Sequence, residues 1–207
     1  MPLCGKSSPR PRLPAEARRA RLLDAALAEF SSHGFTAATI ESIAARAGLS
    51  KSGFYAHFRS KESIFQSLLD TLLMPQLRDP WGAVEQGVPL LVVIDSFIAD
   101  SYRQLVNPVV MALFRVMVAD GPRVAHLTRR WERETLLPYI DAQQQTITRM
   151  VNAGLIRRSP LTDHFVLTVA PVVYTAVRAL VLEGLTPQDV ADLQEAHRQL
   201  LRDMLSP

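Results

Sequence analysis

The sequence predicts an all-α protein with two parts, a small N-terminal domain of three helices and a larger C-terminal helical bundle. Apolar residues recur three and four positions apart in most segments, which is the period of one face of a helix. Prolines and glycines fall between these segments, and no alternating apolar and polar run indicates a sheet. With 207 residues, of which 48% are hydrophobic, the chain can bury a sizeable core as one small and one larger domain.

The first helix is expected at residues 14–32. Its apolar positions repeat with helical spacing, and Gly34 follows where a helix can end in the left-handed region. The helix is therefore amphipathic, with one face available for a small core. That face consists of Leu22, Leu23, Ala26, Leu27 and Phe30.

Residues 39–62 encode two short helices joined by a glycine turn. Thr39 is placed to cap the first helix, because its hydroxyl can accept a hydrogen bond from an N–H of the first turn. Gly48 ends this helix, Leu49 fills the gap between the helices and Ser50 caps the second one. The pattern predicts a helix-turn-helix, with an ordinary bundle corner as the alternative. The buried side of the first helix is formed by Ile40, Ile43, Ala44 and Ala47.

The second short helix has an unusually small outer face. Phe54 and Phe58 lie four positions apart and must face the core, which turns Ser52, Gly53 and Ala56 outward. A helix with short outer side chains can lie deep in the major groove of DNA. The residues expected to contact DNA are Thr39, Ser50, Lys51, Ser52, Gly53, Tyr55, His57 and Lys61.

Three kinds of contact are expected from these residues. Lys51 begins the second helix on the groove side and can reach base edges or phosphate. Tyr55 and His57 lie on the flanks, where a phenol and an imidazole can donate to phosphate oxygens. Ser60 caps the following helix, so Lys61 and nearby backbone N–H groups can bind an anion. The alternatives are a core tyrosine, a surface histidine and solvated lysines.

These residues resemble the TetR family of one-component transcriptional regulators. The resemblance covers residues 15–73 closely and rests on FSSHGF at 30–35, IA at 43–44, AGLSKSGFYAHF at 47–58 and SKE at 60–62. Further along the chain only the layout of helices matches. Ser42 departs from the family pattern, which often has an acidic residue there, and a weaker helix cap is the expected consequence. The resemblance implies a DNA-binding domain followed by a helical domain for effector binding and dimerisation.

The positive charge of the chain is concentrated in the part that carries the motif. Residues 1–61 hold ten Lys and Arg and four acids, whereas residues 62–207 hold thirteen and sixteen. This asymmetry is expected when one end of a chain approaches polyanionic DNA. Residues 1–13, rich in Pro and Arg, are predicted to form a disordered basic arm that either reaches DNA or remains a solvated tail.

After a DNA-binding domain at 14–60, residues 61–207 are predicted to form the effector-binding and dimerisation domain. The helix at 61–74 should pack on both domains, and the following segment, 75–89, reads as a loose connection. Pro138 and Pro171 are expected to kink or break their helices, because proline removes a backbone hydrogen bond and clashes with the preceding turn. The later helices are expected at 90–105, 108–119, 122–153, 163–183 and 187–205.

Two C-terminal helices are apolar enough to need a partner. Residues 165–182 carry one charge, Arg178, in eighteen positions, which favours burial on every side over a membrane span that proline and arginine would interrupt. The last helix begins with a Thr-Pro cap and carries an apolar stripe. We expect half of a four-helix dimer interface, with packing inside one subunit as the alternative. The predicted interface residues are Phe165, Val169, Val173, Val190, Leu193, His197, Leu200, Leu201 and Met204.

The predicted ligand site draws on bulky side chains of the middle helices. Aromatic and methionine residues can line a binding pocket, and ordinary core packing is the alternative for each of them. His126 is the candidate polar anchor of such a pocket. The candidate ligand-binding residues are Phe97, Tyr102, Met111, Phe114, Met117, His126, Trp131, Tyr139 and Tyr174.

No pattern indicates an enzyme, a metal site or a bound cofactor, because the sequence lacks a Gly-rich phosphate loop, a His-Glu zinc helix and a Gly-x-Ser-x-Gly elbow. The single cysteine, Cys4, excludes a disulfide framework, and no secretory signal is visible, so a cytoplasmic protein is expected. The hypothesis is a homodimeric repressor that binds a palindromic operator and is released by a small, largely apolar ligand. A DNA-binding architectural or constitutive regulator without a ligand is the alternative.

Overall fold

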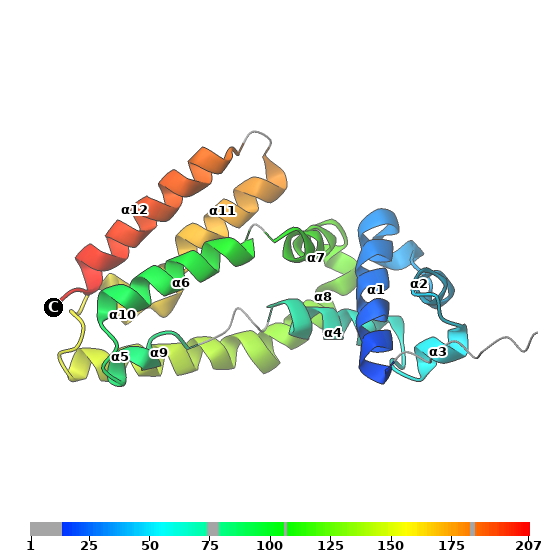
Figure 1. Cartoon of the computed structure of the whole chain (residues 1–207), viewed down its shortest axis with the longest axis horizontal. Helices are drawn as coiled ribbons and strands as arrows, with labels where there is room; N and C mark the ends of the chain where they lie inside the picture. Colours follow the sequence, from blue (N-terminus) through cyan, green and yellow to red (C-terminus); the bar gives the residue numbers. More distant parts are fainter. Residues whose placement is uncertain (1–13, 74–78, 106, 183–184) are drawn as a thin grey trace, which may run out of the picture.

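The computed structural model describes residues 14–73, 79–105, 107–182 and 185–207, and within these ranges the chain forms helices and turns without a strand. The all-α prediction is confirmed. Helices α1–α3 lie at one end of an elongated molecule, and α6 and α9–α12 lie at the other (Figure 1). The principal helices are α1 (Ala15–Ala37), α2 (Ile40–Arg46), α3 (Lys51–Tyr55), α4 (Lys61–Leu73), α6 (Leu90–Leu105), α7 (Pro108–Ala119), α8 (Gly121–Trp131), α9 (Leu137–Asn152), α11 (Ala170–Val181) and α12 (Pro187–Leu205).

Gly34 ends the regular part of α1, as the sequence predicts. Its backbone has φ 77° and ψ 160°, a region that residues with a Cβ rarely enter. After it the chain makes one further helical turn, which the N–H of Ala38 closes by donating to the carbonyl of Gly34 at 3.2 Å. Gly34 thereby turns the chain toward α2.

One apolar core joins the helix-turn-helix to the middle of the chain. Phe54 of α3 and Phe65 of α4 are fully buried in it, together with Leu113 of α7 and Val124 of α8. Helix α4 packs against α1 as well as α7 and α8, as expected for the helix at 61–74. We call this cluster the N-terminal core; its members include Leu22, Phe30, Phe35, Ile43, Phe54, Phe65, Leu113, Leu127 and Trp131.

A second cluster, the C-terminal core, holds α6, α9, α11 and α12 together. Ile94 and Ile98 of α6 are fully buried in it beside Met150 of α9 and Leu201 of α12. Phe114 of α7 is partly buried against both clusters. The predicted domain boundary after residue 60 therefore does not coincide with the boundary of an apolar core, because α7 and α8 share the core of the DNA-binding helices.

Pro138 follows a local change in helix geometry. A π-helical turn, η2 (Glu132–Leu136), lies between α8 and α9, and the N–H of Leu137 donates to the carbonyl of Glu132, five residues earlier. Proline has no N–H and its ring crowds the carbonyl four residues before it, here that of Glu134, so a wider turn relieves both problems. The sequence predicts a kink or break near residues 134–138, and the structure has a π-helical turn at this position.

The expectation for Pro171 was wrong. The chain forms a short helix α10 (Pro160–Asp163) and a 3₁₀ turn η3 (Phe165–Thr168) before α11 begins, so residues 163–183 are not one helix. Pro171 therefore lies in the first turn of α11, where the backbone N–H needs no helical partner.

The expectation of a loose connection at 75–89 was also partly wrong. Residues 74–78 lie outside the described ranges, but from residue 79 onward the segment is ordered by Asp79, whose carboxylate accepts from the N–H groups of Trp81 and Gly82 at 3.1 and 3.0 Å. Trp81 is fully buried just before α5 (Gly82–Glu85), and its ring centroid lies 5.1 Å from that of Phe97 at an interplanar angle of 46°. The segment thus contributes to the C-terminal core.

The predicted basic arm, 1–13, lies outside the described residues. In the ranges that the structure covers, no helix combines the length and apolarity needed to cross a membrane.

Candidate nucleic-acid interface

Two helices of the N-terminal region begin with the same reciprocal cap. The hydroxyl of Thr39 accepts from the N–H of Ser42 at 3.1 Å, and the Ser42 hydroxyl accepts from the N–H of Thr39 at 3.2 Å. Ser60 and Ser63 repeat this arrangement at the start of α4, at 3.1 and 3.0 Å. Ser42 completes the cap of α2 with a neutral hydroxyl in the place where the family pattern often has an acidic residue, and the weaker cap stays a prediction.

The predicted turn and second helix are present. Gly48 adopts φ 70°, and the Ser50 hydroxyl caps α3 by accepting from the N–H of Gly53 at 3.1 Å. Phe54 and Phe58 are buried at 0% and 4% exposure, so the aromatic side of the helix faces the N-terminal core. The outer side is left for contact with another molecule.

Five of the eight predicted DNA contacts are exposed on α2, α3 and their caps. Tyr55 is 49% exposed although it is aromatic, and its ring lies in a T-shaped arrangement with Phe54, with centroids 5.7 Å apart. An exposed tyrosine among hydroxyls and a lysine is well placed to donate to phosphate oxygens. The exposed set is Thr39, Ser50, Lys51, Ser52 and Tyr55.

Gly53 and His57, both predicted to contact DNA, are half-buried. For Gly53 the structure indicates a packing role in the turn. A Cβ at this position would lie 3.3 Å from the Cβ of Leu49 and 3.4 Å from the Ser50 hydroxyl. An added side chain would therefore crowd the turn that precedes α3. Gly53 was predicted to face outward, and the structure places it partly against Leu49.

Lys61 does not project freely toward a ligand. Its ammonium donates to the carbonyls of Thr36 and Ala38 at 3.1 and 2.9 Å and lies 4.8 Å from the ring centroid of Phe35. These contacts fasten the start of α4 to the corner between α1 and α2. A DNA contact from Lys61 would use its remaining N–H, so the residue first of all positions the motif.

Two charged contacts that the sequence did not reveal also fix the motif. Arg46 of α2 donates to Glu29 of α1 at 2.6 Å, and this hydrogen bond holds the pKa of the largely buried Glu29 carboxyl below its usual range. Lys51 forms an ion pair with Glu41 of α2 at 2.6 Å, in which both side chains are exposed. Such pairs join residues on different helices and leave no local spacing signal.

A third contact ties the motif to the rest of the chain. The buried carboxylate of Asp120, between α7 and α8, accepts from the N–H of Phe35 at 2.7 Å across 85 residues of sequence. Arg123 lies 3.4 Å from the same carboxylate. The corner after Gly34 is thus fastened both to α4 and to the α7–α8 junction.

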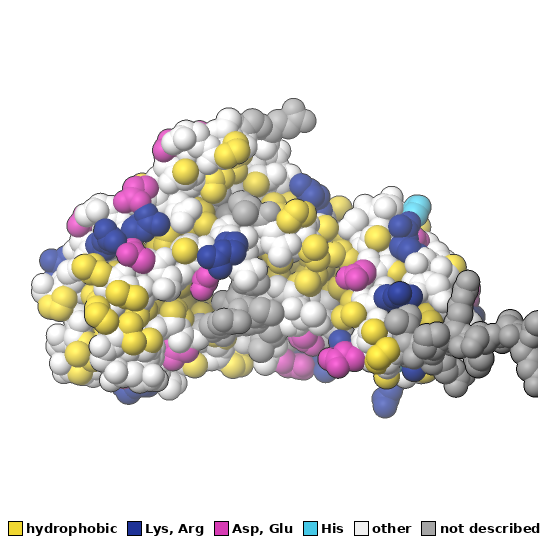
Figure 2. All heavy atoms as spheres, in the orientation of Figure 1, with side chains coloured by type: hydrophobic (Ala, Val, Ile, Leu, Met, Phe, Trp, Pro, Cys, Tyr) yellow, Lys and Arg dark blue, Asp and Glu magenta, His cyan; other side chains and the backbone are white. Residues whose placement is uncertain are grey.

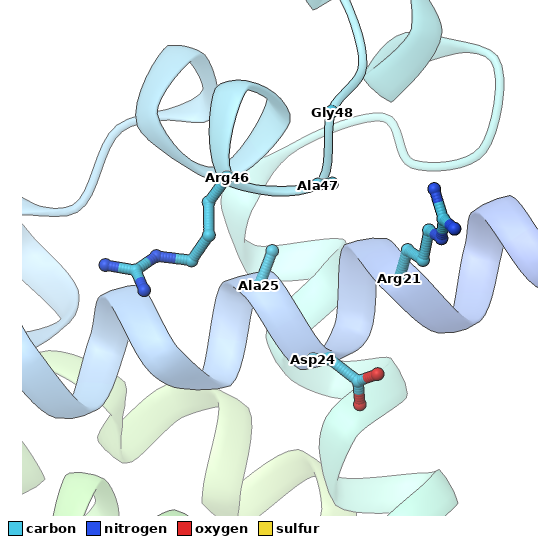
Figure 3. Close-up of a pocket in the computed structure, with 6 residues that line it drawn as sticks. All are labelled: Arg21, Asp24, Ala25, Arg46, Ala47 and Gly48. Carbon is cyan, nitrogen blue, oxygen red and sulfur yellow. The ribbon is translucent and has the colours of Figure 1, made fainter.

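An open pocket of about 450 Å³ lies between α1 and the end of α2. Figure 3 shows Arg21 and Arg46 extending on either side of it, with Ala25 directed toward the Gly48 turn. None of the predicted ligand-binding residues lines this pocket. The Arg46 guanidinium is already bound by Glu29. The pocket is an open groove between packed helices at the rim of the motif.

The structure brings together some of the predicted ligand-binding residues and separates others. Met117 and Trp131 belong to the N-terminal core. His126 is exposed on α8 and Tyr174 is 56% exposed on α11, so the proposed polar anchor lies at the surface and both residues are outside any interior site. The residues that meet in the C-terminal core are Phe97, Tyr102, Met111, Phe114 and Tyr139.

The predicted dimer residues also divide by position. Phe165, His197 and Leu201 are buried within the chain at 2%, 2% and 0% exposure, so they cannot form a contact surface for a second subunit. Phe165 packs against Tyr139 of α9 with ring centroids 5.9 Å apart, and the His197 Nε2 is 2.9 Å from the carbonyl of Thr168 in the 3₁₀ turn. Val173 and Leu200 are exposed, and the half-buried members of the set are Val169, Val190, Leu193 and Met204.

An apolar stripe on α11 was only partly anticipated. Val173, Val177 and Val181 follow one another at four-residue spacing and are 55%, 52% and 65% exposed, beside the exposed Tyr174 and Leu182. Hydrophobic side chains are visible on the face of the molecule formed by α6, α11 and α12 (Figure 2). We call these five residues the α11 stripe. Exposed apolar side chains gathered on one helix face are typical of an interaction site.

The fold and the motif define the class of protein: a helix-turn-helix DNA-binding domain joined to a helical bundle. The profile described as "Bacterial regulatory proteins, tetR family" matches residues 22–68. An HTH-type transcriptional repressor of Streptomyces coelicolor is 41% identical over 59 residues, covering 28% of this chain and 31% of that protein. The alignment thus spans less than a third of the length of this curated relative.

Solved structures match over nearly the whole chain. A protein of Mesorhizobium loti assigned to the TetR family has a TM-score of 0.70 at 19% identity, covering 95% of this chain and 100% of that one. The flavonoid-responsive regulator FrrA has a TM-score of 0.63 at 21% identity, covering 93% and 98%. The chain therefore carries a tetR-type DNA-binding motif at residues 22–68 and shares the fold of these solved structures.

Proposed function

We propose that the protein is a repressor that binds a palindromic operator as a homodimer and is released by a small, largely apolar ligand. The observation that carries the proposal is the exposed set on α2 and α3, in which hydroxyls, a lysine and a phenol surround a helix with a small outer face. The concentration of positive charge in residues 1–61 supports a polyanionic partner.

A palindromic site is expected because a two-fold symmetric dimer presents the same recognition helix twice. Selection from a library of random duplexes with the full chain tests this directly. The recovered sequences should contain an inverted repeat with a fixed spacing between half-sites. Recovery of a single, non-repeated asymmetric site would contradict the proposal, and absence of any enriched sequence would remove sequence-specific binding altogether.

Dimerisation through the α11 stripe is supported by its exposed apolar side chains. Val177→Glu places a charge in the middle of the stripe, where a dimer interface would desolvate it without a partner. Val177 is 52% exposed in one chain, so the substitution should leave the folded subunit intact. Val92→Glu on α6 is the matched control, because Val92 is also 52% exposed and lies outside the stripe.

Sedimentation velocity measures the result. The Val177→Glu variant should sediment as a monomer and lose affinity for the selected duplex, while the Val92→Glu variant should remain a dimer. If the Val177→Glu variant remains a dimer, the dimer interface lies on another surface. Loss of the dimer in both variants would show that the effect is not confined to the stripe.

The proposed ligand-binding region is the C-terminal core. Two buried polar atoms, the indole Nε1 of Trp81 in this core and the amide Oε1 of Gln143 on α9, have no hydrogen-bond partner among the described residues. Buried polar groups are normally paired, and a ligand carrying an acceptor and a donor would pair these two. The five aromatic and methionine residues of this core would supply the apolar contacts.

Thermal unfolding in the presence of small apolar compounds tests this part of the proposal. A flavonoid belongs in the panel, since the structurally similar FrrA is flavonoid-responsive. A compound that raises the unfolding temperature should also release the selected duplex. If a broad panel gives no compound with both effects, the constitutive regulator without a ligand becomes the better description.

A route from the C-terminal core to the DNA-binding helices is present. Phe114 of α7 contacts both cores, and Asp120 at the end of α7 holds the corner after Gly34. Helix α4 packs against α7 and α8 as well as α1. A ligand that displaces α7 would therefore move α1 and α4 with it and change the separation of the two recognition helices in a dimer.

A further inference from the structure

Lys51, which is predicted to contact DNA from the start of α3, forms an ion pair with Glu41 in the free protein. The Nζ of Lys51 lies 2.6 Å from the Oε1 of Glu41, which belongs to the first turn of α2. The two side chains are 57% and 58% exposed. An ion pair this exposed contributes little to the stability of the fold. Because the pair lies on the side of both helices that is proposed to face DNA, it can affect DNA binding.

Glu41 differs in kind from Glu29, the other acid that binds a cation of the motif. Glu29 is 6% exposed and holds Arg46, so it fixes α2 against α1. Glu41 is exposed among the residues of the proposed DNA-binding face, where a carboxylate is repelled by phosphate groups. The pair lowers the pKa of the Glu41 carboxyl and raises that of Lys51, first of all through their hydrogen bond, so both groups are charged at neutral pH.

We propose that Glu41 determines DNA selectivity by restraining Lys51. The inference rests on the proposed DNA-binding function of α2 and α3. On DNA of arbitrary sequence, Lys51 stays beside Glu41 and does not release a counterion from phosphate. On the operator, a base acceptor such as the O6 and N7 atoms of guanine draws Lys51 into the groove and replaces the carboxylate. Glu41 thereby weakens binding to random DNA more than binding to the operator.

The test compares the full-length wild type with Glu41→Gln, which keeps the shape of the side chain and removes its charge. The probes are the duplex recovered by selection with the wild type and a scrambled duplex of the same length and composition, each titrated over a range of salt. We expect the scrambled duplex to bind about 3- to 10-fold more tightly, and its salt slope to steepen by roughly one per subunit. Affinity for the selected duplex should change less than 3-fold, so selectivity falls.

Two further variants decide whether Glu41 acts through Lys51. Glu16→Gln is the charge-matched control, because Glu16 is an exposed acid in the first turn of α1 that makes no ion pair with Lys51. It should leave selectivity unchanged. In a Lys51→Ala background, Glu41→Gln should no longer strengthen binding to the scrambled duplex. The unfolding midpoints of all variants should match the wild type, since none of these exposed side chains is buried on folding.

Three outcomes would overturn the inference. Equal strengthening by Glu16→Gln would assign the effect to net charge, and persistence of the Glu41→Gln effect without Lys51 would assign it to direct repulsion of phosphate. If Glu41→Gln binds the scrambled duplex as the wild type does, Glu41 does not restrain Lys51 on random DNA. In each case a wild type that prefers the selected duplex leaves the proposed function standing. A wild type without any preference would instead refute the proposed function.

Discussion

Gly34→Ala is expected to destabilise the protein through two effects at the corner that joins the motif to α7 and α8. The backbone of Gly34, at φ 77° and ψ 160°, lies in a region that is nearly restricted to glycine. Holding another residue there costs about 1–3 kcal/mol. In addition, the new Cβ would lie 3.1 Å from the Oδ2 of Asp120, the atom that accepts from the N–H of Phe35.

The carboxylate cannot give way without weakening that hydrogen bond. It is 7% exposed and bonded at 2.7 Å to Phe35, and a hydrogen bond to a charged group contributes about 1.5–3 kcal/mol. If a few tenths of an ångström of displacement removes part of this contribution, the total loss is about 2–4 kcal/mol. For a chain of this size the unfolding temperature should fall by roughly 4–16 °C.

Urea denaturation followed by circular dichroism, at one fixed protein concentration, measures the loss. Gly154→Ala is the matched control: Gly154 has φ 68° and open space around its position, so only the backbone conformation is strained. The cost of Gly34→Ala should also shrink when Asp120 is replaced by Ala, since the crowded carboxylate is then absent. A loss no larger than that of Gly154→Ala, or one unaffected by Asp120→Ala, would refute the role assigned to the contact.

Three other changes test how the fold positions the site. Lys61→Met keeps the side-chain stem and removes the ammonium that binds two carbonyls at the end of α1, so stability should fall by about 1–2 kcal/mol in urea denaturation, and Lys61→Arg should restore part of it. Burial lowers the pKa of His197, so the folded state resists its protonation. Stability is therefore complete above the unfolded pKa of about 6.5 and declines as pH falls below it, and a flat pH profile in His197→Gln, against a falling one in the wild type, checks this. Trp81→Ala should cost about 3–5 kcal/mol because the indole is fully buried, whereas Trp81→Phe, which keeps a ring against its neighbour, should cost clearly less.

The helix-turn-helix could be predicted because its signals act over a few residues. Thr39 and Ser50 cap the helices that follow them directly, and Gly48 supplies the turn within the same stretch. Phe54 and Phe58 repeat at helical spacing, so their common burial is a property of one helix. The helix expected at 163–183 was misjudged, because the chain forms a 3₁₀ turn before α11 and Pro171 falls in the first turn of α11.

The ligand and dimer residues could be predicted only in part, because their environment depends on which helix covers which face. Spacing showed that α12 carries an apolar stripe, but it did not show that His197 and Leu201 turn toward α6 while Leu200 faces outward. Likewise, an aromatic residue such as Tyr174 has the same local pattern whether it lines a core or lies on the surface.

The sequence by itself determined the all-α fold, the caps and turn of the motif, and the concentration of basic residues at one end, since each follows from neighbouring residues or from composition. Only the tertiary structure decided the contacts that position the motif. Asp120 reaches Phe35 across 85 residues, and Glu41 meets Lys51 from another helix. Such contacts depend on the packing angles and rotations of whole helices, which are set by the two shared cores and leave no trace in local spacing.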